Sequence, residues 1–339
     1  MRNKSLDVAK AIAACLVVCI HVSFPGETGQ IIKVLARCAV PFFFMVSGYF
    51  CYYENNNATV KIPFKIIHIL KLFAVSILFY CVWEYLMKVL DGESTATWIK
   101  EVTDMEHLKE FAFYNSTSPV RAHLWFLPAL IYCYAVDFCI EKLHIRKAAY
   151  CCIPILFVVL LWRAEFCGFA GGFYHTMEYR NFLFTGMNFY LTGQLIHEKQ
   201  DKLEQRTAAG LDRILIAGIT VGIAMGILEY CLQGAREIYL GNCITVIGLF
   251  IWLILYGREK TFPQMLAEAG QKYAFPVYLL HPAVADAAKK ISGFTGISSH
   301  LCWRWSRPVL VYVITVLLIT CILNVISMLK SVHKRENVV

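Results

Sequence analysis

Long apolar runs recur along the whole chain, and short polar stretches separate them. Each run approaches the ~20 residues that an α-helix needs to cross the hydrocarbon core of a bilayer. The pattern therefore predicts an all-α polytopic membrane protein with about ten transmembrane helices. The predicted spans are residues 6–24, 31–53, 62–90, 122–140, 148–163, 180–197, 211–232, 238–256, 262–289 and 307–329.

The composition supports this class. Hydrophobic residues make up 58% of the 339 residues and charged residues 17%, and the mean hydropathy is +0.55. A soluble chain of ordinary composition carries about 25% charged residues. No stretch between the spans is long enough to fold as a separate soluble domain. We therefore expect residues 1–339 to form a single transmembrane domain whose helix bundle does any chemistry.

The basic residues predict an orientation in the membrane. If the N-terminus is cytoplasmic, every inner loop contains Lys or Arg, as the positive-inside rule demands. The longest outer loop, residues 91–121, is instead rich in Asp and Glu. We expect a multi-pass protein of the cell membrane, surrounded by the lipid bilayer, with both termini in the cytoplasm. The net charge of +8 then follows from topology and gives no reason to expect a nucleic-acid partner.

The cysteines do not predict a metal centre. The chain has 14 of them, but no CxxC pair and no spacing typical of a metal site, and most lie within apolar runs. Cysteines in this pattern are small core residues. We expect no bound metal and no tightly bound cofactor.

Two titratable side chains, Lys10 and His21, lie within the first apolar run, LDVAKAIAACLVVCIHV. Charge inside a membrane helix is costly, so it is rarely kept without a polar cavity to serve. Eleven residues turn a helix by about 1100°, so these side chains lie within roughly 20° of each other, about 16 Å apart in height. Asp7 falls on the same stripe. The alternative is an anchor helix in which Lys10 snorkels and His21 lies among the headgroups.

The predicted topology brings further polar side chains to the outer end of the bundle. Arg37 comes about two turns below the outer end of the second span, and His281 comes near the outer end of the ninth. His123 and Trp125 begin the fourth span from the outer side. With His21, these residues predict a substrate cavity near the outer surface. Chance placement of interfacial side chains is the alternative.

A second cluster is predicted at the cytoplasmic end of the third span. The sequence KIPFKIIHILK places Lys65, His68 and Lys71 at three-residue spacing. Such neighbours share a helix face and are suited to holding a cytosolic phosphate or an anionic cofactor. The alternative is a positive-inside anchor. Four further polar residues inside spans either line a cavity or tie helices together: Glu84, Asn188, Gln194 and Asn242.

Four sequence elements resemble the integral-membrane acyltransferase family 3: LDVAKAIAACLVVCIHV, ARCAVPFFFMVSGYF, AHLWFLPAL and FPVYLLHPAV. They follow one another in order from the first span to the ninth. The chain is similar also to the membrane half of vancomycin-resistance serine racemases. The resemblance implies ten core spans and transfer of an acyl group, often acetyl, from a cytosolic donor such as acetyl-CoA to a carbohydrate or other cell-envelope acceptor.

The resemblance also implies roles for particular residues. Lys10 and His21 match the family's essential pair, and Arg37 matches part of its cavity. Where the family has an arginine pair for the phosphates of CoA, this chain has only lysine and histidine, which do not form the bidentate fork of arginine. Many members carry an extra extracytoplasmic domain that completes transfer, and we expect none here. Either the chain then acts directly on its acceptor, or a partner completes the transfer.

The residue chemistry fits an O-acyltransferase. Removal of the acceptor hydroxyl's proton needs a base, and His21 is suited to this near neutral pH. Arg37 is the candidate for stabilising the oxyanion, and Lys10 for contacting the donor's arm or pairing with Asp7. His123 or His281 are alternative bases. The competing functions are a membrane transporter of a small molecule such as serine, and a scaffold or sensor that binds a partner.

Overall fold

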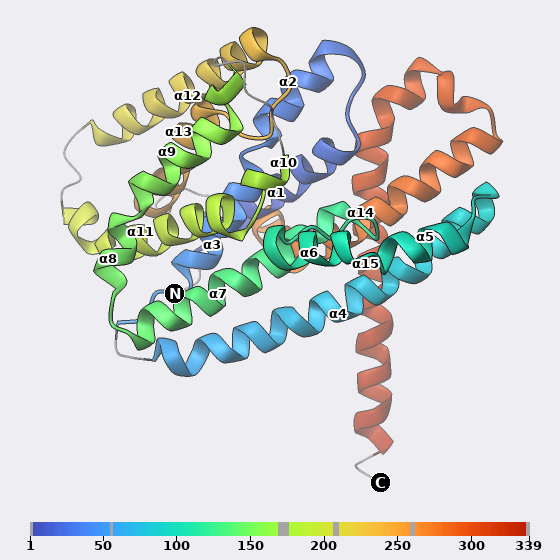
Figure 1. The fold of residues 1–339 in the computed structure, drawn as a ribbon, viewed down its shortest axis with the longest axis horizontal. Coiled ribbons are helices and arrows are strands. Elements are labelled where there is room, and N and C mark those ends of the chain that lie inside the picture. The colour runs from blue at the N-terminus through green and yellow to red at the C-terminus, as the bar shows by residue number, and fades with distance from the viewer. Residues whose placement is uncertain (1–2, 55–56, 169–175, 206–209, 258–261, 337–339) are drawn as a thin grey trace. The chain divides into compact units, whose positions relative to one another are not determined.

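The computed structural model describes residues 3–54, 57–168, 176–205, 210–257 and 262–336 (Figure 1). Every regular element within these ranges is a helix, and none is a strand. Six helical segments in the same ranges are long and apolar enough to cross a membrane. The predicted class, an all-α polytopic membrane protein, is therefore confirmed. The six segments are Gly26–Tyr49, Ala58–Asp91, Ala122–Lys142, Arg146–Ala164, Leu211–Gln233 and Leu301–Ser331.

Six of the ten predicted spans overlap a single helix and four overlap two successive helical segments, but the number of membrane crossings is not confirmed as ten. The helices beyond the six apolar segments are either short or interrupted by charge. The helix over Leu240–Leu255 has 16 residues, and the first helix carries Asp7 and Lys10. Charged residues lower the hydropathy of a helix whether or not they line a protein interior.

The chain divides into two compact units, which are described separately. Unit 1 comprises residues 1–39 and 257–339. Its helices are α1 (Lys4–His21), α2 (Gly26–Ala36), α14 (Gln264–Phe294), the short 3-10 helix η4 (Ile297–Ser299) and α15 (Leu301–Glu336). Asn3 caps the N-terminus of α1: its Oδ1 accepts hydrogen bonds from the backbone N–H groups of Ser5 and Leu6, at 3.1 and 3.3 Å.

The main packing in unit 1 is between α1 and α14. Gly270 of α14 has no side chain at the point of closest approach, where a Cβ would lie 1.7 Å from the carbonyl oxygen of Asp7. The two backbones are therefore in direct contact. Further along, the rings of His21 and His281 meet. Both helices run from the first contact to the second, so α1 and α14 are parallel.

Unit 2 comprises residues 40–256. Its helices, including α3 whose first residue precedes the unit by one position, are α3 (Ala39–Tyr49), α4 (Ala58–Asp91), α5 (Thr95–Val102), α6 (Met105–Tyr114), η1 (Ala122–Trp125), α7 (Phe126–Lys142), α8 (Arg146–Cys151), α9 (Ile153–Ala164), η2 (Phe166–Gly168), α10 (Thr176–Tyr179), η3 (Phe182–Met187), α11 (Asn188–Gln205), α12 (Leu211–Gln233) and α13 (Leu240–Leu255).

The first half of α11 is mostly buried in unit 2, where α3, α9 and α13 contact this helix. Gly48 of α3 and Gly193 of α11 let the two backbones touch: a Cβ on Gly48 would lie 1.9 Å from the carbonyl oxygen of Tyr190, and one on Gly193 would lie 2.1 Å from that of Met45. Helices α12 and α13 meet in the same way at Gly222 and Gly241. Small residues at such contacts are typical of helix packing in membranes.

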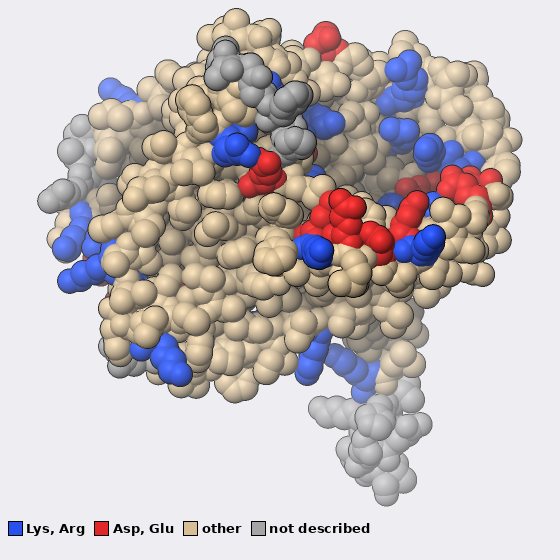
Figure 2. Space-filling model, in the orientation of Figure 1, with Lys and Arg blue, Asp and Glu red and all other residues tan. Residues whose placement is uncertain are grey.

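The outer helices of unit 2 present apolar surface. Only 11% of the most apolar stretch of α4 is buried inside the protein, and the same holds for α12. A soluble protein would not expose apolar surface of this extent, so these faces fit contact with lipid. Acidic side chains gather over α5 and α6 (Figure 2), within the predicted outer loop. They are Glu93, Glu101, Asp104, Glu106 and Glu110. The predicted orientation itself stays a prediction.

Candidate active site

Two of the predicted site residues of unit 1, His21 and His281, lie together. The centroids of their rings are 5.1 Å apart, and the ring planes are inclined by 46°. His21 is exposed at the end of α1. His281 is completely buried in α14, where its Nδ1 lies 2.9 Å from the carbonyl oxygen of Val277. Residues 260 positions apart in the chain thus form a pair of imidazoles.

Lys10 forms an ion pair with Asp7. This pairing is one of the two roles that the sequence analysis considered for Lys10. The Nζ atom lies 3.1 Å from Oδ1 of Asp7, one helical turn earlier on α1. The Asp7 side chain is 7% exposed and that of Lys10 is 22% exposed. This pair offsets the cost of burying either charge. Lys10 and His21 occupy one face of α1, about 16 Å apart along its axis.

Arg37 lies at the break between α2 and α3. Its backbone is helical, at φ −60° and ψ −18°, and its N–H closes the last turn of α2 by bonds of 3.2 Å to Lys33 and Val34. The side chain is half-buried. This places Arg37 at a helix terminus within the predicted second span.

His123 of unit 2 lies in an aromatic and ionic cluster. It is 5% exposed, on η1, and its ring centroid is 5.1 Å from that of Tyr80 in an edge-to-face arrangement. The guanidinium of Arg121 lies over the same Tyr80 ring, 5.2 Å from its centroid, and forms an ion pair with Glu84. The sequence predicted that Glu84 lines a cavity or ties helices together. In the structure, its ion pair with Arg121 joins α4 to the segment before η1.

Trp125 lies two residues beyond His123 and is 8% exposed. The guanidinium of Arg180 is 5.9 Å from its ring centroid, within the range of a cation–π interaction. Arg180 also lies 3.5 Å from the carboxylate of Glu237. The ring of Phe44 contacts Trp125 at 5.9 Å between centroids. Trp125 is thus part of the packed interior of unit 2.

Lys65, His68 and Lys71 all lie on α4, and Lys65 contacts the chain beyond α3. Lys65 Nζ donates a hydrogen bond of 2.7 Å to the carbonyl oxygen of Phe50 and lies 3.1 Å from Sγ of Cys51. It therefore holds the chain just beyond the end of α3. His68 and Lys71 are exposed on α4. Their role as a phosphate clamp stays a prediction.

Comparison with known proteins identifies the chain's family. The model of the family Acyl_transf_3, described as an acyltransferase domain, matches residues 3–326. The chain belongs to acyltransferase family 3. The resemblance seen in the sequence is thereby confirmed, and nearly the whole chain forms a membrane acyltransferase domain of this family. No solved structure shows a significant match.

Curated relatives of this family 3 domain are racemases. An amino-acid racemase of Enterococcus faecalis is 28% identical over 218 residues, which is 59% of this chain and 29% of the relative. A second amino-acid racemase of that species is 31% identical over 144 residues, 38% of this chain and 18% of the relative. A serine/alanine racemase of Enterococcus gallinarum is 44% identical over 59 residues, 16% of this chain and 8% of the relative. The chain thus covers less than a third of each relative's length.

Sequence reasoning missed a buried carboxylate in the family 3 domain. Asp137 of α7 is completely buried. Its Oδ2 accepts a hydrogen bond of 2.6 Å from the hydroxyl of Tyr190, and both its oxygens lie 2.9 Å from Nε2 of Gln194. Gln194 therefore ties α11 to α7. An acidic residue inside the apolar run IYCYAVDFCI was the available signal, since such residues are rarely kept without a function.

A second carboxyl group that the sequence did not single out lies just beyond α9. Glu165 is completely buried, and its oxygens accept bonds of 3.1 Å from Gln233 and 2.9 Å from the N–H of Leu240. Glu229 accepts a bond of 3.1 Å from the N–H of Gly241 and is hydrogen-bonded to Glu165. Burial, with the nearby Glu229 carboxylate, raises the pKa of Glu165 to about 7.

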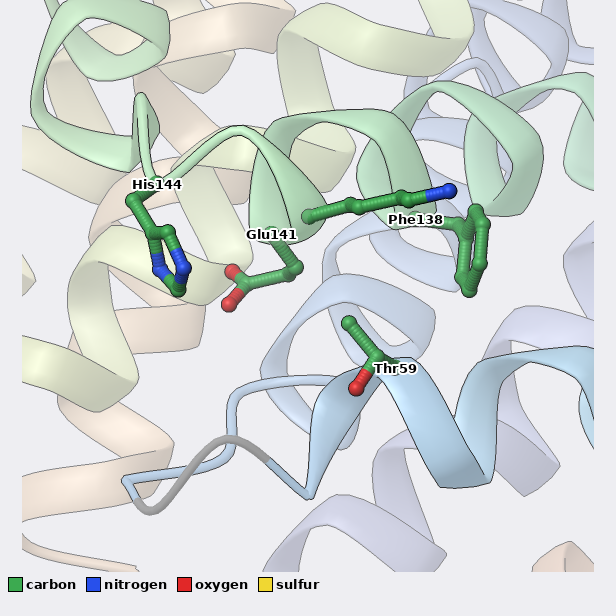
Figure 3. A pocket seen from close by; sticks show the side chains of 5 residues that line it. Thr59, Phe138, Glu141 and His144 are labelled. Atoms are coloured by element: carbon green, nitrogen blue, oxygen red, sulfur yellow. The ribbon is translucent and has the colours of Figure 1, made fainter.

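Unit 2 also has a pocket of about 350 Å³ between the start of α4 and the end of α7. Figure 3 shows the side chains of Thr59, Phe138, Glu141 and His144 around it, and Lys142 completes the lining. Acidic, basic and apolar groups are mixed here, so the lining favours neither an anionic nor a cationic ligand.

Proposed function

We propose that this chain is a membrane O-acyltransferase. It moves an acyl group, with acetyl expected, from a cytosolic acyl-CoA to a hydroxyl of a carbohydrate or another cell-envelope acceptor. The observation that carries the proposal is the match of an acyltransferase domain to residues 3–326. The contact between His21 and His281 supports it, because acyl transfer to a hydroxyl needs a base that works near neutral pH.

The proposed reaction divides the work among residues of unit 1. His21 removes the proton of the acceptor hydroxyl, whose oxygen then forms a bond to the acyl carbon. Arg37 stabilises the negative charge that develops on the acyl oxygen. The bond between the acyl carbon and the donor's sulfur breaks, and the sulfur takes the proton from His21. Lys10, paired with Asp7, is the proposed contact for the donor's arm.

The first experiment measures the transfer of a labelled acyl group from acetyl-CoA to envelope carbohydrate by the purified protein in liposomes. His21→Ala should lower transfer by at least about 100-fold, since general-base catalysis contributes about 10²–10⁴-fold. The same replacement at exposed His300 of unit 1 is the matched control and should leave transfer unchanged. Near-normal transfer by His21→Ala would remove His21 from the mechanism.

The donor site needs a separate test. Replacing Lys65, His68 and Lys71 by alanine should weaken the use of acetyl-CoA if they hold its phosphates, and the loss should grow with salt. Lys65 also bonds to the end of α3, so the double variant that keeps Lys65 separates phosphate binding from packing. An unchanged KM for acetyl-CoA in the double variant would exclude His68 and Lys71 from the donor site.

A transporter of a small neutral molecule is the second candidate. The similarity to a protein named serine/alanine racemase favours serine as its cargo. A serine transporter has no need of a cytosolic phosphate clamp, so its flux should survive the triple replacement. Labelled serine uptake is therefore measured beside acyl transfer in the same liposomes. Serine flux without thioester consumption would refute the acyltransferase proposal.

A further inference from the structure

The hydrogen bond inside α14 defines the proton arrangement of His281. Its Nδ1 lies 2.9 Å from the carbonyl oxygen of Val277, and a carbonyl oxygen only accepts. Nδ1 therefore carries the hydrogen. In the neutral ring, Nε2 then keeps a lone pair and is a hydrogen-bond acceptor. His281, which carries this acceptor nitrogen, is completely buried.

Among the residues that the structure describes, none forms a hydrogen bond to the buried Nε2 of His281, but the distance between the two rings accommodates one after rotation of the exposed His21 ring. A bond of about 2.9 Å between nitrogens of two imidazoles, each about 1.1 Å from its ring centre, places the centroids about 5 Å apart. The centroids of His21 and His281 are 5.1 Å apart. His281 is buried and bonded to its own helix, whereas His21 is exposed at the last residue of α1. His281 is thus the fixed ring and His21 the adjustable one.

We propose that His281 is a positioning residue for His21. When the His21 ring rotates toward it, Nε2 of His281 accepts a hydrogen bond from one ring nitrogen of His21, which leaves the other nitrogen of His21 unprotonated and directed at the acceptor hydroxyl. This role for His281, which is to orient the base His21, rests on the proposed acyltransferase function. A base held by a third group is the general arrangement of activated nucleophiles.

The carboxylate next along α14 does not replace His281 in this role. Asp286 lies five residues later, which turns the helix by about 140° and advances it by about 7.5 Å. It therefore does not share the face on which His281 meets His21. The neutral imidazole has one advantage over a carboxylate: burying it in the bundle costs less, because no charge loses its hydration.

Two substitutions of His281 test the proposal through kinetics. His281→Leu keeps a buried apolar side chain but removes the acceptor, and kcat for acyl transfer should fall about 10–100-fold, as for other outer-shell partners, with the KM for acetyl-CoA within about twofold. His281→Gln places an amide oxygen near the position of Nε2 and should recover about tenfold of that loss. His300→Leu is the control and should leave kcat unchanged. Full kcat in His281→Leu, or equal loss in the Leu and Gln variants, would overturn the proposal.

Nuclear magnetic resonance gives a readout that does not need activity. Nitrogen-15 shifts of labelled histidine distinguish the two neutral tautomers, and the His21 signals are assigned by their loss in His21→Ala. His21 should occupy one tautomer in the unmodified protein and both in His281→Leu. An unchanged tautomer ratio would refute the positioning role even if acyl transfer is observed. Loss of the single tautomer in a protein that transfers no acyl group would instead refute the proposed function and retain the hydrogen bond.

Discussion

Replacement of Gly270 by alanine tests the contact that aligns α1 with α14. A Cβ at this position would lie 1.7 Å from the carbonyl oxygen of Asp7 and 2.9 Å from the backbone nitrogen of Ala11. Carbon and oxygen approach to about 3.3 Å, so α1 has to move by about 1.5 Å. Overpacking of this kind costs about 1–3 kcal/mol. Because the obstacle is backbone, no side-chain rotation relieves it.

Gly293 of the same helix is the matched control. No atom lies within 4 Å of the position that its Cβ would take. Alanine there should stabilise the protein by about 0.5–1 kcal/mol, since glycine is the poorer helix former. The two variants should therefore differ in free energy of unfolding by about 1.5–4 kcal/mol.

Thermal unfolding of both purified variants in detergent measures this difference. Gly270→Ala should melt about 4–10 °C below Gly293→Ala, given a few degrees per kcal/mol for a chain of this size. It should also lower kcat, because a displaced α1 moves His21 away from His281. A melting temperature of Gly270→Ala equal to or above that of Gly293→Ala would show that the backbones of α1 and α14 do not touch.

Three further outcomes are expected. Asp137→Ala removes the acceptor of the buried Tyr190 hydroxyl and the nearer acceptor of Gln194, and should lower the free energy of unfolding by about 2–4 kcal/mol in thermal melts, whereas exposed Cys139→Ala should change it by less than about 0.5 kcal/mol. Because the folded protein raises the pKa of Glu165 from 4.5 to about 7, stability should fall by up to about 3 kcal/mol as pH rises between these values. Glu165→Gln should remove that fall, and a fall of equal size in the variant would contradict the assignment. Reporters fused after Val339 and within residues 91–121 should report opposite sides of the membrane; a shared side would overturn the predicted topology.

The sequence by itself determined the helices and the family. A membrane helix satisfies its own backbone hydrogen bonds, so length and hydropathy of each apolar run predict it without knowledge of its neighbours. The predicted spans overlap helical segments for this reason, although breaks such as the one at Arg37 were not predicted. The stripe of Asp7, Lys10 and His21 on α1 followed equally from helix geometry, because positions on one helix depend only on spacing.

Only the tertiary structure decided which polar side chains meet across helices. The contact of His21 with His281, and of Asp137 with Tyr190, joins residues far apart in the chain, and helical spacing carries no information about a neighbouring helix. The spacing of Lys65, His68 and Lys71 placed them on one stretch of α4, but the bond of Lys65 to the carbonyl oxygen of Phe50 appears only in the folded chain. Burial, the choice of hydrogen-bond partner and the raised pKa of Glu165 depend on groups from several helices at once, so they exist only in the folded bundle.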